Sequence, residues 1–193
     1  MNITWNGGSF FNLNTQKDKN SNIDVAIEPI NSKNKENVIL LKSDKVASGQ
    51  LKSDTKPFLI SGPGEYEIGG VFVQSIDIPS KKPFYLIETE SITICYISSL
   101  SQEELKLDFD NIDILIIDIN GSDNDRAKEV AKIIAQIEPK IVIPMGYDNS
   151  KQLDEFLKIM GIEKQEEVSK LNIKNKDLSS REGVEVVVLS SKK

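Results

Sequence analysis

The segments IDILII (residues 112–117) and KIVI (residues 140–143) frame the part of the chain that decides the fold class. Each is a short apolar run rich in isoleucine and valine, which is typical of a strand buried on both faces. Between them, apolar residues recur at three- and four-residue spacing, which predicts an amphipathic helix that begins near residue 122 and ends before Pro139. A strand, a helix and a second strand in this order predict a parallel pair joined by a crossover.

The chain on either side of this unit is rich in predicted strands and poor in helices. A second amphipathic helix is predicted over residues 150–160, ending at Gly161. Residues 14–22 are polar and predict a hairpin loop. The predicted strands are 2–5, 10–13, 23–27, 38–41, 58–60, 64–68, 70–78, 84–88, 92–97, 168–173 and 183–189. We therefore expect one domain over residues 1–193, an α/β or α+β sandwich that is strand-rich with few helices.

Composition excludes several classes of function. Acidic residues number 30 and basic residues 24, giving a net charge of −6, so the basic surplus of a nucleic-acid-binding protein is absent. The sequence contains no histidine, so no imidazole is available as a zinc ligand or as a general base. Its single cysteine, Cys95, lies in an apolar strand and is expected to be buried and inert. With neither a signal peptide nor a membrane span in the pattern, we expect a cytoplasmic protein.

Four segments together resemble the metallo-β-lactamase superfamily, in its small lactonase-like branch of metal-dependent hydrolases. They are ITWNGGSF (residues 3–10), ISGPGEYEIGGV (residues 60–71), IDILII (residues 112–117) and EPKIVIPMGY (residues 138–147). That branch typically carries W-x-G-H-S, G-P-G-E-Y-E followed by two glycines, and P-M-H-Y at the corresponding places. The resemblance is strong over residues 58–148, moderate over 1–50 and weak after 150. It implies an αββα sandwich with a zinc site made by loops at the ends of the strands.

The residues at the implied metal positions do not supply that site. The resemblance places them in the glycine turn, in the loop after strand 38–41, after strand 92–97, and after strand 140–143. They read Gly8, Lys42, Asp44, Val46, Ala47, Ser99 and Gly146, and Asp44 stands where the family has a histidine. A zinc site needs about three or four N, S or O donors within roughly 2.0–2.3 Å. We therefore expect no cofactor, although the family normally binds zinc, and no catalytic residue.

Three readings of function follow. The first is a pseudoenzyme, a non-catalytic binding or assembly module, and because proteins of this fold often assemble, a homo-oligomer is expected. The second is a hydrolase with a remodelled carboxylate site for Mg²⁺ or Mn²⁺, with Glu28, Asp44, Asp118 and Asp148 as the candidate ligands. The third is a sensor that binds an unidentified small molecule in the vacant pocket. No nucleic acid or membrane partner is expected. A nucleophilic serine at Ser98 or Ser99 with Lys42 as its base is a weaker option.

Overall fold

The structure is a computed structural model, and it describes residues 1–18, 20–30, 36–41, 57–77, 84–98, 111–121 and 124–191. Within these residues the strands form two large sheets and one small one. The first sheet has the order β13-β1-β2-β3-β4-β5. Its strands are β1 (Asn2–Trp5), β2 (Phe11–Asp18), β3 (Ser21–Ile27), β4 (Val38–Leu40), β5 (Phe58–Ile60) and β13 (Leu171–Asn172). The strands β3, β4 and β5 run parallel to one another.

The second sheet contains the strand–helix–strand unit predicted at the centre of the sequence. Its order is β14-β11-β10-β9-β8-β7-β6. Its strands are β6 (Gly64–Ile68), β7 (Val71–Ile76), β8 (Phe84–Thr89), β9 (Ile92–Ile97), β10 (Ile114–Asp118), β11 (Ile141–Met145) and β14 (Glu185–Val186). The pairs β9/β10 and β10/β11 are parallel, which confirms the predicted crossover. A small third sheet pairs β12 (Glu167–Val168) with β15 (Val188–Leu189).

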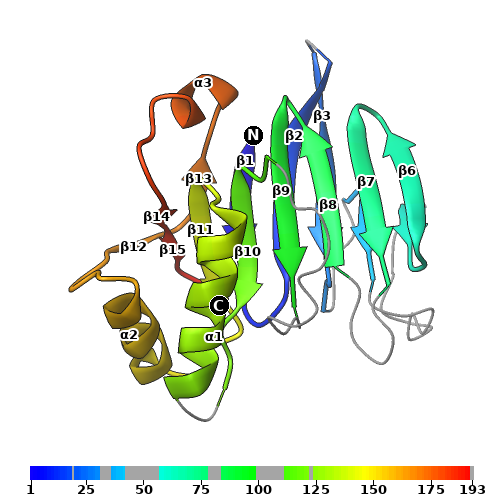
Figure 1. Cartoon of the computed structure of the whole chain (residues 1–193). Helices are drawn as coiled ribbons and strands as arrows, with labels where there is room; N and C mark the ends of the chain where they lie inside the picture. The colour runs from blue at the N-terminus through cyan, green and yellow to red at the C-terminus, as the bar shows by residue number, and fades with distance from the viewer. Residues whose placement is uncertain are drawn as a thin grey trace.

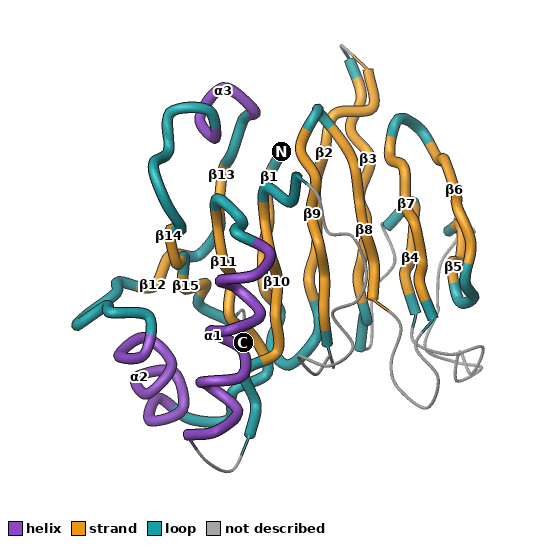
Figure 2. The backbone as a smooth tube through the Cα atoms, in the orientation of Figure 1, coloured by secondary structure: helices purple, strands orange, loops and turns teal. Residues whose placement is uncertain are grey.

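Helices α1 (Asn124–Ile137) and α2 (Ser150–Ile159) lie on the outer side of the second sheet and leave the two sheets facing each other (Figures 1 and 2). The short α3 (Asn175–Leu178) lies apart from them, and its Leu178 packs into the core between the sheets. One buried cluster fills the space between the sheets, where Ile114 and Ile116 of β10 point. The alternate residues of the same strand, Leu115 and Ile117, point into a second cluster beneath α1 and α2. Burial on both faces explains why this strand reads as an uninterrupted apolar run. The predicted sandwich is thereby confirmed.

Three details of the predicted layout are wrong. The polar segment 14–22 was expected to be a hairpin loop, but β2 and β3 extend through most of it. Cross-strand side-chain bonds stabilise this extension, including one from Asn14 Nδ2 to Asp24 Oδ1 at 2.6 Å. The late strand predicted over residues 168–173 is split in two, because β12 pairs with β15 whereas β13 pairs with β1. The strand predicted over residues 183–189 is divided in the same way, into β14 and β15.

Among the described residues, no helix combines the length and the apolar character that a membrane crossing requires.

Candidate functional site

The carboxyl ends of the parallel strands in both sheets meet at one edge of the sandwich, toward which the arrows of β9 and β10 point in Figure 1. We call this the site edge and define it by five described residues: Gly8, Glu28, Ser98, Asp118 and Gly146. Each follows a strand directly or lies in the turn after it. The resemblance implies that the metal-binding loops lie at this edge.

Two buried tyrosines of the second sheet bond the first sheet at the site edge. Tyr96 Oη donates a hydrogen bond to the carbonyl oxygen of Ser9, and Tyr85 Oη donates to that of Leu41, each at 2.8 Å. Both side chains are fully buried. The acceptors belong to the loops after β1 and β4, which are loops where the resemblance places metal ligands. The two phenols therefore hold Ser9 and Leu41 against the opposite sheet.

Two carboxylates raise the pKa values of these tyrosines. Burial raises the pKa of Tyr96 well above its usual value, and the charges of Glu28 and, more weakly, Asp118 raise it further. Burial likewise raises the pKa of Tyr85, and Glu28 adds to that rise through its charge and a hydrogen bond. Glu28 and Asp118 come from different sheets, and the charges of both act on Tyr96.

Gly146, which stands at an implied histidine position, has no room for a side chain. Its φ is +80°, a left-handed conformation that favours glycine. A Cβ built on Gly146 would lie 2.4 Å from Asp118 Oδ1 and 2.6 Å from its Cγ. Asp118 Oδ1 also accepts a hydrogen bond from the backbone N–H of Asn120 at 2.7 Å, which fixes the carboxylate there. The Asp118 carboxylate thus occupies the space that a ligand side chain at position 146 would need.

Gly8 differs from Gly146, because a Cβ on Gly8 would meet no atom within 4 Å. The turn around it is closed by a hydrogen bond from the N–H of Phe10 to the carbonyl oxygen of Gly7 at 3.0 Å. Trp5 Nε1 donates to the carbonyl oxygen of Gly8, also at 3.0 Å. Gly8 therefore contributes a shaped turn to the site edge but no side-chain donor.

Of the remaining predicted residues, the structure describes only Asp148. Lys42, Asp44, Val46, Ala47 and Ser99 lie outside the described residues. Asp148 is exposed in the loop before α2, where its backbone N–H donates to Gln152 Oε1 at 2.8 Å. Within the described part of the chain, no three Asp, Glu, Cys or His side chains gather as a metal would require. Glu28, Asp118 and Asp148 thus do not form a three-carboxylate site among themselves, and the described donors do not fit tetrahedral zinc.

Sequence reasoning missed Tyr85 and Tyr96. The available signal was strand alternation, because each tyrosine shares a face with isoleucines of its own strand, Ile87 or Ile94, in the core between the sheets. A hydroxyl on an otherwise apolar buried face needs a partner, and near a strand end that partner is often a loop carbonyl.

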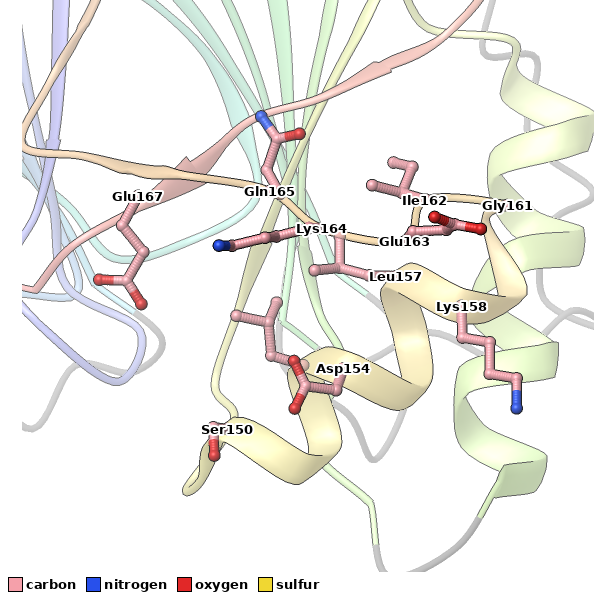
Figure 3. A pocket seen from close by; sticks show the side chains of 11 residues that line it. Ser150, Asp154, Leu157, Lys158, Gly161, Ile162, Glu163, Lys164, Gln165 and Glu167 are labelled. Atoms are coloured by element: carbon pink, nitrogen blue, oxygen red, sulfur yellow. The ribbon is translucent and has the colours of Figure 1, made fainter.

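A hollow of about 770 Å³, lined by none of the five residues that define the site edge, lies between α2 and residues 161–167 (Figure 3). Its apolar floor includes Leu153, Leu157 and Ile162. Its charged side chains are exposed and of both signs, including Asp154 and Lys164. That mixture selects for no single ligand chemistry, so the site edge is the better candidate.

The two facing sheets, the covering helices and the loop-lined edge define the metallo-β-lactamase fold. The sequence model of the family described as "Beta-lactamase superfamily domain" matches residues 2–146, and the chain belongs to this family. No curated protein matches the sequence.

Solved structures agree on the fold. A Thermotoga maritima protein, provisionally described as a Zn-dependent hydrolase of the metallo-beta-lactamase superfamily, superposes with a TM-score of 0.72 at 20% identity, covering 98% of this chain and 100% of the other. The metallo-beta-lactamase fold protein YhfI from Bacillus subtilis gives a TM-score of 0.61 at 12% identity, covering 100% and 97%. At these identities the likeness shows the fold alone.

Proposed function

We propose that this protein is a non-catalytic binding or assembly module, a member of the family that has lost its metal centre and its hydrolase activity. The supporting observation is the position of the Asp118 carboxylate, which lies where a side chain at position 146 would begin. This position supports the loss of a metal ligand at residue 146, because a side chain there would first have to displace the Asp118 carboxylate. The backbone of Gly146 has adapted to the same arrangement, since its φ of +80° disfavours other residues.

The tyrosine bonds support the same proposal. A hydrolytic metal site keeps one coordination position open for water. Here Tyr85 and Tyr96 direct their hydroxyl protons to loop carbonyls at the site edge. These bonds stabilise the joined sheets, and they use polar groups that would otherwise be available to a substrate. The two bonds therefore support a structural role for the site edge.

Metal analysis of the purified full chain tests this proposal. After dialysis at neutral pH with added ZnCl₂, we expect much less than one zinc per chain and no hydrolysis of lactone or phosphodiester substrates. Stoichiometric zinc that is retained through dialysis, together with metal-dependent hydrolysis, would contradict the proposal. The same samples, with MgCl₂ or MnCl₂ in place of ZnCl₂, test the carboxylate-site alternative.

Assembly is a separate part of the proposal. Light scattering of the purified chain across a hundredfold concentration range measures it directly. We expect a mass above 21.5 kDa, the mass of one chain. A monomer at every concentration would leave binding, without self-assembly, as the role of the module.

A further inference from the structure

A second hollow, of about 400 Å³, lies at the end of the sandwich opposite the site edge. The site edge lies at the carboxyl ends of β1, β3 and β9, whereas this hollow lies where β1 and β3 begin and beside the turn that precedes β9. The N-terminus and α3 mark this end of the molecule in Figure 1. We call it the amide hollow, because five of the side chains that line it are amides: Asn2, Asn14, Gln16, Asn22 and Asn175.

The register of the first sheet brings three of these amides together. Asn2 of β1 lies directly opposite Asn14 of β2. Asn14 Oδ1 accepts a hydrogen bond from Asn22 Nδ2 at 3.0 Å, and Asn14 Nδ2 donates to Asp24 Oδ1 at 2.6 Å. These bonds hold the Asn14 and Asn22 side chains in fixed orientations before any ligand arrives. A ligand that contacts fixed polar groups loses less free energy to the ordering of side chains.

The amides of Asn2 and Asn175 remain available to a ligand. Neither side chain makes a hydrogen bond to another described residue, and both reach solvent. Backbone bonds between Met1 and Ile173, at 3.0 and 3.1 Å, hold the segment that leads to Asn175 beside the start of β1. Each amide has two N–H donors and an acceptor oxygen. Each of them can therefore bond a hydroxyl group that either donates or accepts.

The charged groups of the amide hollow do not select a charged ligand. Glu90 accepts hydrogen bonds from Thr15 Oγ1 at 2.8 Å, from the Gln16 N–H at 2.7 Å and from the terminal ammonium at 3.0 Å. Its negative charge is therefore balanced within the protein. Lys174 is exposed, where solvent screens its charge. No described residue that lines the hollow is aromatic, so a nucleobase would find no ring on which to stack.

We propose that the amide hollow binds a neutral, polyhydroxylated molecule of monosaccharide size, with Asn2 and Asn175 as its main hydrogen-bonding residues. A sugar hydroxyl both donates and accepts, so neighbouring hydroxyls on one molecule complement neighbouring amides. The volume lies within the range of about 300–1,000 Å³ that is typical of small-molecule sites. The proposal goes beyond the non-catalytic function above, because it concerns the other end of the sandwich and does not depend on a metal.

Nuclear magnetic resonance of the full chain, labelled with ¹⁵N, tests the proposal. The probes are D-glucose, D-galactose and D-mannitol, and the signals are the side-chain NH₂ groups of Asn2 and Asn175. We expect saturable shifts with at least one probe, with a dissociation constant in the millimolar range. The matched control is tetrahydropyran-2-methanol, which has the pyranose ring but a single hydroxyl, and it should give no saturable shift. Absence of saturable shifts with all three probes, or equal shifts with the control, would overturn the proposal.

Three variants localise the binding. Asn2→Ala and Asn175→Ala each remove an amide that bonds no described residue, so the protein should stay folded while affinity falls about fivefold. Asn172→Ala is the matched control, because Asn172 is exposed and lies opposite Asn2 in the register but does not line the hollow. Its affinity should equal that of the wild type, with circular dichroism as the check on folding. Wild-type affinity in both Asn2→Ala and Asn175→Ala would contradict the assignment.

The metal analysis and the sugar titration give separate answers. A zinc-loaded, hydrolytic protein would refute the non-catalytic role whatever the sugars do. A metal-free, inactive protein without sugar-dependent shifts would refute only the sugar site.

Discussion

Replacing Gly146 by alanine tests whether the Asp118 carboxylate closes the site edge. The new Cβ would stand 2.4 Å from Asp118 Oδ1, a distance that forces one of the two groups to move. Forcing alanine into a left-handed backbone costs about 1–2 kcal/mol. Displacing the carboxylate from the Asn120 N–H adds about 1.5–3 kcal/mol, the usual value for a hydrogen bond to a charged group. We therefore expect the free energy of unfolding to fall by roughly 2.5–5 kcal/mol.

Gly161 provides the matched control. Its φ is +76°, close to that of Gly146, but a Cβ there would meet no atom within 4 Å. Gly161→Ala should therefore lose only the backbone term of about 1–2 kcal/mol. Urea unfolding followed by circular dichroism measures both variants, with the slope m checked for equality. The double variant Gly146→Ala/Asp118→Ala should recover part of the loss. If Gly146→Ala costs no more than Gly161→Ala, the carboxylate does not fill that space.

Three further predictions concern other described contacts. Tyr96→Phe removes the hydroxyl that donates to the Ser9 carbonyl oxygen, so urea unfolding should show a free energy of unfolding lower by about 1–2 kcal/mol. A decrease below 0.5 kcal/mol, about the effect of a surface substitution, would show that this hydrogen bond does not stabilise the contact between the sheets. Partial burial opposes ionisation of Glu90, but bonds from the Gln16 N–H, the terminal ammonium and Thr15 outweigh it and lower its pKa. The stabilisation by the ionised carboxylate is present above the ordinary glutamate pKa and is lost as the pH falls through the lower pKa of the folded protein. Glu90→Gln should therefore reduce the fall of the melting temperature at acid pH, measured in melting curves. Burial raises the pKa of the Cys95 thiol, so a thiol reagent should label the native protein only as fast as it unfolds, and rapid native labelling would show that the strand is open.

Much of the fold follows from local pattern. The apolar runs at residues 112–117 and 140–143, with an amphipathic segment between them, correctly predicted β10, α1 and β11. Gly161 correctly predicted the end of α2, whose cap Asn149 accepts the N–H of Gln152 at 3.1 Å. Local pattern failed at residues 14–22, because polar side chains that bond across a strand pair look the same in sequence as those of a loop.

The candidate site was only partly predictable. Gly8 and Gly146 were identified through the family resemblance, whereas Glu28 and Asp118 were chosen because they follow or lie near predicted strand ends. The arrangement of these residues relative to one another was not predicted. Asp148, which was also chosen for its place near a strand end, is exposed to solvent. The tyrosines were overlooked because their partners are remote, with 87 residues separating Ser9 from Tyr96.

The sequence by itself determined the two-sheet class, the order of its elements and the loss of every histidine. These follow from the composition, from the spacing of apolar residues and from the positions of glycines, which can be read from a few neighbouring residues at a time. Only the tertiary structure decided that the Asp118 carboxylate fills the space beside Gly146, and that Glu28 of one sheet acts on Tyr85 and Tyr96 of the other. Such contacts depend on the register of several strands at once. A shift of one residue in any of them would turn these side chains to the opposite face.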